Sequence, residues 1–170
     1  MIIEVVTAGL LVRSPYRRGL MRAYKRVFEG KPWYESWPMP LVEKEFRSLA
    51  KQIPFGYIGL EGEKPIAFII AVNRAIRDPV MWNGIYIAEF GVIPEMQCRG
   101  LGTILAQTFV EQFRSEGPFM FRTLNPVVPL IFRKLCYVEC MGCAKDDSYA
   151  KVLLLSKTCQ NGCQPATSPS

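Results

Sequence analysis

Short apolar runs alternate with amphipathic stretches along this chain, and the pattern predicts strands separated by helices. In an amphipathic helix apolar residues recur every three or four positions, whereas a buried strand alternates or is apolar throughout. A helix expected after Ser14-Pro15 carries its apolar side chains on one stripe, at Leu20, Met21, Tyr24, Val27 and Phe28. Strands are predicted at 2–7, 56–62, 65–73, 85–93, 119–124, 137–141 and 151–156, and the remaining helices at 41–52, 101–116 and 125–135.

The predicted element order is β-α-α-β-β-β-α-β-α-β-β, which favours an α+β sheet with helices on both faces. A chain of 170 residues that is 49% hydrophobic can form one domain with a substantial core. Neither an internal repeat nor a linker interrupts the pattern. We therefore expect one domain over 1–158 and a flexible polar tail over 159–170.

The composition excludes some catalytic mechanisms and indicates a cellular compartment. The chain contains no histidine, which excludes Ser-His-Asp catalysis, Cys-His catalysis and histidine-ligated metals. The apolar N-terminus contains Glu4 and lacks a basic start, so it reads as a strand and not as a signal peptide. No apolar run reaches the ~18 residues of a membrane helix. A cytoplasmic location with six reduced cysteines is the expectation, and the net charge of +6 favours an anionic ligand.

Two glycines stand between the strand that ends near Ile93 and the helix that begins near residue 101. A helix start leaves backbone N–H groups without partners and carries partial positive charge, so it suits a phosphate. Gly100 and Gly102 would let a ligand approach the backbone, and Arg99 adds positive charge. The lysine of a Walker loop and the third glycine of a dinucleotide loop are both missing. A pyrophosphate site and a simple tight turn both remain open on spacing alone.

The segment Gln97–Gly102 (QCRGLG) resembles the Q/R-x-x-G-x-G/A signature of the GNAT superfamily of N-acetyltransferases. Residues 92–94 (VIP) are similar to the hydrophobic-x-Pro that ends the fourth strand of that family. Asn125 and residues 130–137 (LIFRKLCY) are similar to the family's Asn and its downstream "YxKxGF" segment. With the element order included, the resemblance spans about residues 2–156. It implies a mixed, mostly antiparallel sheet.

The resemblance implies that acetyl-CoA is the acyl donor and that its pyrophosphate binds the amides of residues 98–103. The pantetheine arm would lie along the end of the fourth strand, where that strand and the strand at 119–124 separate. Asn125 matches a position that contacts the cofactor. The implied cofactor-binding residues are Val92, Ile93, Gln97, Cys98, Arg99, Gly100, Leu101, Gly102, Thr103 and Asn125.

Direct transfer to an amine needs a general base, and Glu89 is the first candidate. Related sequences often carry an acid three residues before the position of Val92, and a carboxylate on an apolar strand should have a raised pKa. The alternatives are that Glu89 pairs with an arginine such as Arg122 or points to solvent. Glu35 and Glu43 are further candidates for the acceptor side. A backbone N–H near Val92 would stabilise the oxyanion.

The general acid is not apparent. The tyrosine usual in the family corresponds to Phe132, which cannot donate a proton. Tyr137 takes the family's phenylalanine position, where a core role is the simpler interpretation, and Cys136 stands where glycine is common. Cys136 and Tyr137 are kept as catalytic candidates beside Glu89. The other possibilities are protonation by water or release of the thiolate as an anion.

The first helix and the loop after it are basic and aromatic. The helix contains Arg17, Arg18, Arg22, Lys25 and Arg26, and the loop PWYESWPMP (32–40) follows. A solvated helix face beside a loop that packs its own aromatics is one interpretation. An acceptor site for something acidic, such as an acidic protein surface or an RNA, is the other.

Four cysteines have spacing close to that of a zinc ribbon: Cys140, Cys143, Cys159 and Cys163. A zinc site is possible on this spacing, but the family needs no metal, so unligated thiols are the main expectation.

We therefore expect an acetyl-CoA-dependent N-acetyltransferase whose amine acceptor is a small molecule or a protein. Two rivals remain: a non-catalytic acyl-CoA-binding domain, which Phe132 favours, and an acetyltransferase that acts on aminoacyl-tRNA. The protein would not bind a membrane and would be a monomer or a homodimer.

Overall fold

The computed structural model describes residues 2–6, 11, 14–77, 81–116, 119–123, 125–135, 138–140 and 150–155. The predicted order of elements is confirmed, although several bounds differ by a few residues. The elements are β1 (Ile2–Val6), α2 (Arg17–Glu29), α3 (Met39–Ala50), β2 (Phe55–Glu61), β3 (Lys64–Arg77), β4 (Met81–Val92), the 3-10 turn η1 (Pro94–Met96), α4 (Leu101–Phe113), β5 (Phe119–Thr123), α5 (Val127–Lys134), β6 (Val138–Cys140) and β7 (Ala150–Leu155).

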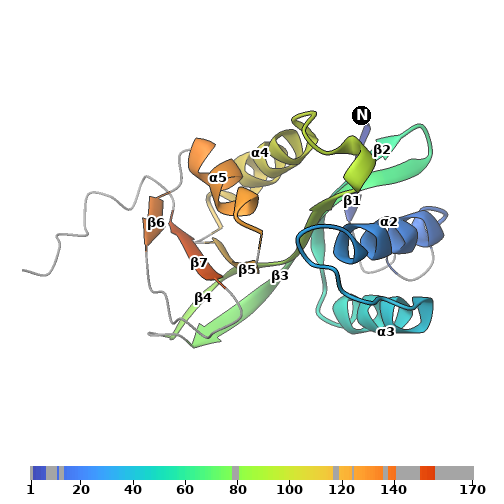
Figure 1. Ribbon diagram of the computed structural model, residues 1–170. Helices are drawn as coiled ribbons and strands as arrows, with labels where there is room; N and C mark the ends of the chain where they lie inside the picture. Colours follow the sequence, from blue (N-terminus) through green and yellow to red (C-terminus); the bar gives the residue numbers. More distant parts are fainter. Residues whose placement is uncertain are drawn as a thin grey trace, which may run out of the picture.

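The strands form one sheet in the order β1-β2-β3-β4-β5-β7-β6. The β4–β5 pair is parallel and every other described pair is antiparallel. Helices α2 and α3 lie on one face of the sheet, and α4 and α5 lie on the other (Figure 1). This arrangement confirms the expected α+β class and the mixed, mostly antiparallel sheet. Within the described parts of the chain, no helix has the length and apolar character needed to cross a membrane.

Each face of the sheet has its own hydrophobic core, because both sides of the central strands are apolar. On the α2/α3 face, the buried stripe of α2 packs with Phe46 of α3 and Phe68 of β3. On the α4/α5 face, Phe109 of α4 and Phe132 of α5 pack over Phe119 of β5. All of these phenylalanines are fully buried. The two cores fix the sheet between its helices and so fix the strand ends that form the site.

Two boundaries differ from the prediction for physical reasons. Helix α2 begins at Arg17, because Ser14 Oγ accepts the N–H of Tyr16 in a turn before the helix instead of capping it. Strands β3 and β4 extend beyond the predicted 65–73 and 85–93. Their backbones stay paired as far as Arg77 and Met81, which lie beyond the apolar runs from which the strands were predicted.

A β-bulge in β4 determines which face Glu89 occupies. Ile87 pairs with Ala71 and Glu89 pairs with Ile70, which leaves Ala88 without a counterpart on β3. Side chains of a regular strand alternate between faces, so Glu89 would follow Ile85 and Ile87 to the α4/α5 face. The extra residue reverses the alternation, and Glu89 faces α2 instead.

The pairing of β4 with β5 stops before either strand ends. The last paired residues are Ile87 and Phe121, whereas β4 continues to Val92. Residues 89 to 92 of β4 therefore pair with β3 on one side and with no strand on the other. This separation of the two parallel strands is the opening that the sequence resemblance implied.

Candidate active site

The loop between η1 and α4 turns sharply at two residues with left-handed backbone. Cys98 has a φ of 59° and Gly100 a φ of 77°. A non-glycine residue such as Cys98 rarely adopts such a φ, so the turn at this position is unusual. A Cβ added at Gly100 would meet no atom within 4 Å, so the glycine faces open space. We call residues 97–103 the glycine loop. Successive N–H groups in such turns form a concave anion site.

The glycine loop runs into the first turn of α4, whose N-cap is Gly100. The first helical hydrogen bond runs from the N–H of Ile104 to the carbonyl of Gly100, at 3.0 Å. The N–H groups of Leu101, Gly102 and Thr103 precede that bond and have no intrahelical acceptor. These amides and the positive end of the helix dipole point at the open space beside Gly100.

The end of β4 leads directly to this loop. Gln97 Nε2 donates to the carbonyl of Val92 at 3.0 Å, and the N–H of Ile93 donates to Ile66 of β3 at 2.9 Å. In an antiparallel ladder the backbone groups of alternate residues point to opposite sides. Since the N–H of Ile93 points to β3, the N–H groups of Phe90 and Val92 point to the opposite side, where β5 no longer pairs with β4. An extended ligand can bond there as an added strand.

Asn125 lies between β5 and α5, two residues before the first residue of the helix. Its Oδ1 accepts the N–H of Val127 at 3.0 Å, and its own N–H donates to Thr123 Oγ1 at 3.0 Å. The structure therefore gives Asn125 a local role in the β5–α5 turn. The other predicted cofactor residues lie in one continuous stretch from Val92 to Thr103.

A pocket of about 270 Å³ lies beside β4 at the point where the two strands part. Tyr24, Phe28 and Glu45 line it from the α2/α3 face, while Phe121 and Val128 line it from the other side. Because residues of both cores line it, the pocket reaches through the gap between the strands. The remaining lining residues are Trp33, Glu35, Trp37, Tyr86, Ile87, Ala88, Glu89, Phe90 and Thr123.

Glu89 contributes a partly buried carboxyl to this pocket. Burial is the largest cause that raises the pKa of Glu89 to about 8, and the negative charges of Glu45 and Glu35 add to it. The Tyr24 hydroxyl donates a hydrogen bond to the carboxyl and acts in the opposite direction, lowering its pKa. Burial, together with Glu89, raises the pKa of Tyr24 above its usual range, so Tyr24 stays a donor. A carboxyl with a pKa near neutrality is suited to accept and release a proton.

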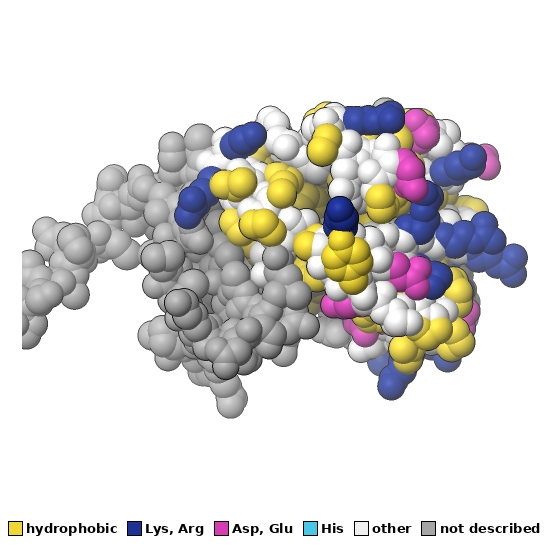
Figure 2. Space-filling model, viewed as in Figure 1, with side chains coloured by type: hydrophobic (Ala, Val, Ile, Leu, Met, Phe, Trp, Pro, Cys, Tyr) yellow, Lys and Arg dark blue, Asp and Glu magenta, His cyan; other side chains and the backbone are white. Residues whose placement is uncertain are grey.

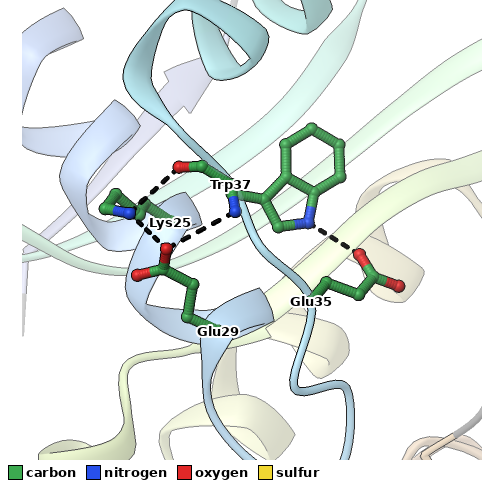
Figure 3. A network of polar contacts seen from close by, with 4 residues as sticks. All are labelled: Lys25, Glu29, Glu35 and Trp37. Atoms are coloured by element: carbon green, nitrogen blue, oxygen red, sulfur yellow. Dashed lines mark hydrogen bonds and ion pairs between the residues drawn. The ribbon is translucent and has the colours of Figure 1, made fainter.

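The aromatic loop after α2 forms one wall of the pocket, and α2 holds it in place (Figure 3). Lys25 pairs with Glu29 one turn along the helix and also donates to the carbonyl of Trp37 at 3.1 Å. Glu29 in turn accepts the N–H of Trp37 at 3.4 Å. The indole Nε1 of Trp37 donates to Glu35 Oε2 at 2.6 Å. These bonds fix the Trp37 ring and the Glu35 carboxylate at the pocket.

Of the two further acids expected on the acceptor side, Glu35 and Glu43, one lines this pocket. Glu35 lines the pocket as expected. Glu43 does not: it pairs with Arg17 at 3.8 Å and with Arg47 at 3.1 Å. Glu45 takes its place. The available signal was the helical pattern of α3, because position 45 falls on the same stripe as the buried Val42 and Leu49.

Basic side chains gather over the outer side of α2 (Figure 2). Arg18, Arg22 and Arg26 are exposed there, and Arg26 forms an ion pair with Glu95 of η1. The pocket is lined by the buried side of α2, through Tyr24 and Phe28. The basic surface and the acidic pocket are therefore on different sides of the helix.

Phe132 is fully buried and contacts Phe90 and Phe121, with ring centroids 5.9 Å and 5.1 Å away. It is a core residue. Cys136 and Tyr137 lie outside the described residues, as do Cys143, Cys159 and Cys163 of the zinc hypothesis, the tail and the side chains of Arg122 and Cys140. The roles expected of these residues stay predictions.

Known proteins share this architecture. Residues 20–124 match the acetyltransferase (GNAT) family, and no curated protein matches the sequence. The chain is similar to PH1933 from Pyrococcus horikoshii, with 15% identity, a TM-score of 0.69 and coverage of 89% of this chain and 97% of that one. The PaiA N-acetyltransferase of Thermoplasma acidophilum, solved with coenzyme A, has 13% identity and a TM-score of 0.57, with coverage of 90% of this chain and 98% of that one. Tetrahymena GCN5 has 16% identity and a TM-score of 0.61, with coverage of 91% of this chain and 93% of that one.

At these identities the solved structures show a shared fold. The family match covers more than half of the 170 residues and includes the glycine loop and β4. This chain belongs to the acetyltransferase (GNAT) family.

Proposed function

We propose that this protein transfers an acetyl group from acetyl-CoA directly to an amine. The observation that carries the proposal is the position of Glu89. Its carboxyl, with a pKa raised to about 8, lies in a pocket at the gap where β4 and β5 part. A base at that point can take the proton from an amine that enters from the α2/α3 face.

The residues of the glycine loop fit the diphosphate of coenzyme A. The open space beside Gly100, the left-handed turns at Cys98 and Gly100, and the unpaired amides at the start of α4 together form a cradle for a diphosphate. Exposed Arg99 adds positive charge beside it. Acetyl-CoA supplies the activated thioester when it is bound. The unpaired edge of β4 is where we place the pantetheine arm.

The chain's own groups then account for the remaining steps. Glu89 removes the ammonium proton, and Tyr24 holds the carboxyl in position while it does so. The N–H groups of Phe90 and Val92 point into the gap and can donate to the developing oxyanion. The family's usual tyrosine is absent at Phe132, so we propose that the thiolate leaves as an anion and takes its proton from water.

The pH profile tests the base. Glu89 must be ionised to act, so kcat/KM should rise about tenfold per pH unit below pH 8 and level off above it. In Tyr24→Phe the bond that lowers the Glu89 pKa is lost, so the rise should move to higher pH. Tyr57→Phe is the matched control, since Tyr57 lies on β2 and does not line the pocket. An unchanged profile in Tyr24→Phe would contradict the role given to Tyr24.

A non-catalytic acyl-CoA-binding domain is the second candidate, and buried Phe132 favours it. Two measurements distinguish these functions. One follows the release of free thiol from acetyl-CoA in the presence of mixed amines, and the other follows thermal stabilisation of the protein by acetyl-CoA. Release that depends on an amine supports the enzyme. Stabilisation without turnover on any amine supports the binder. Action on aminoacyl-tRNA is disfavoured, because Glu35, Glu45 and Glu89 line the pocket and would repel phosphates.

A further inference from the structure

The acceptor side of the pocket has an unusual charge balance. Three carboxyl groups line it, and they come from three elements: Glu35 from the aromatic loop, Glu45 from α3 and Glu89 from β4. Among the described residues that line the pocket there is no lysine or arginine. The nearby basic residue Lys25 pairs with Glu29 and the loop backbone instead. The pocket therefore carries more negative charge than one ammonium group can neutralise.

From this balance we propose that the acceptor is a slender alkyl diamine, with a second positive charge a few carbons from the reacting nitrogen and no negative group. The inference rests on the proposed function, because it assigns the substrate class of the same pocket. It divides the three acids by role. Glu89 takes the proton of the reacting ammonium, and Glu45 and Glu35 hold the second ammonium.

The positions of the two accessory acids support this division. After burial, the charge of Glu45 is the largest influence on Glu89, and the charge of Glu35 also acts on it. All three acids line this one pocket, so one ligand can face them together. Glu35 is also held in place, because Trp37 Nε1 donates to it at 2.6 Å. An uncompensated pair of carboxylates in a partly buried site is unfavourable, and a second cation relieves it.

The rest of the wall suits a chain of methylene groups that ends in cations. Trp33, Trp37, Tyr24 and Phe28 line the same side, with Tyr24 and Trp37 in an edge-to-face contact at 5.2 Å. Aromatic faces attract ammonium groups and also pack against alkyl carbon. A carboxylate or phosphate on the acceptor would face the three acids and find no cation among the described lining residues. Free amino acids and phosphorylated amines are disfavoured for that reason.

The test compares acceptors that share one carbon chain. Wild-type protein is assayed for acetyl transfer from acetyl-CoA to 1,4-diaminobutane, n-butylamine and 4-aminobutanoate, with a lysine-containing peptide as a fourth acceptor. We expect kcat/KM for the diamine to exceed that for butylamine by roughly tenfold or more, and 4-aminobutanoate to be the poorest. Comparable values for diamine and butylamine, or a preference for 4-aminobutanoate or the peptide, would overturn the inference and leave the proposed function standing. No transfer to any of the four would also overturn the inference, and the assay with mixed amines would then decide whether the proposed function stands.

A variant tests whether this pocket causes the preference for the diamine. Glu45→Gln removes one of the two acids assigned to the second ammonium, so the diamine-to-butylamine ratio should fall about tenfold. Glu43→Gln is the matched control, since Glu43 lies two residues earlier on α3 and pairs with Arg17 and Arg47 outside the pocket. It should keep the wild-type ratio. Thermal unfolding without ligand shows whether each variant is folded. A folded Glu45→Gln that keeps the full ratio would contradict the assignment.

Discussion

Replacing Gly102 with aspartate is expected to abolish coenzyme A binding, with a rise in Kd of at least ~100-fold. Gly102 is the second residue of α4, among the amides assigned to the diphosphate. A Cβ there would lie 3.4 Å from Ile131 Cδ1 and 3.5 Å from Val92 Cγ2, so it points to the junction of α4, α5 and β4. A carboxylate at that point repels the diphosphate and obstructs the path along β4. Calorimetric titration with coenzyme A measures the loss.

Two control variants separate repulsion from misfolding. Gly102→Ala adds a methyl group at ordinary van der Waals distance or slightly closer, so it should fold and keep most of the affinity. Gly62→Asp makes the same change of charge in the β2–β3 turn, where a Cβ meets nothing within 4 Å and where aspartate adopts the left-handed φ of 59° more readily than most residues. It should bind coenzyme A like the wild type. If Gly102→Asp is folded and its Kd is unchanged, the diphosphate does not bind at the glycine loop.

Replacing Glu89 with glutamine should lower kcat by ~100-fold or more and leave coenzyme A affinity intact. Glutamine keeps the size of the side chain and can still accept the Tyr24 hydrogen bond, but it cannot take a proton. The rise of kcat/KM below pH 8 should also disappear. Glu111→Gln on the exposed side of α4 is the control and should keep wild-type kinetics. An unaltered rate in Glu89→Gln would remove Glu89 from the mechanism.

The same variant has an expected stability signature. The pKa of Glu89 is raised from an ordinary 4.5 to about 8, so the stability it contributes is fully present below pH 4.5 and is lost as pH rises through 8. Glutamine cannot ionise. Glu89→Gln should therefore equal the wild type in Tm near pH 4.5 and exceed it above pH 8, by about 2–4 °C per kcal/mol recovered. A Tm difference that does not change with pH would mean that Glu89 is not buried as described.

The order of elements was predictable because each helix carries a clear apolar stripe and each central strand a continuous apolar run. The stripe of α2 and the run over 65–73 are the strongest examples. The ends of β3 and β4 were harder to predict, because pairing beyond Asn73 involves residues such as Arg74 and Arg77 that give no hydrophobic signal. The glycine loop was visible in the sequence as two glycines before a helix, and the family resemblance gave it a ligand.

The orientation of Glu89 was not accessible from periodicity. Two-residue alternation places it with Ile85 and Ile87, and only the bulge at Ala88 turns it toward Tyr24. The resemblance to the family suggested the acceptor side, whereas the structure supplies the cause. Tyr24 shows a related limit. Its place on the α2 stripe predicts a core residue, which it is, but the partner of its hydroxyl comes from a strand more than sixty residues away.

In the proposed mechanism the glycine loop holds a diphosphate so that the thioester reaches the gap between β4 and β5, opposite Glu89. A crystal structure of the protein with coenzyme A is the decisive experiment. We expect the diphosphate on the amides of residues 98–103, the pantetheine arm along Phe90 and Val92, and the sulfur facing the Glu89 pocket. A diphosphate bound elsewhere, or a sulfur that lies away from that pocket, would contradict it.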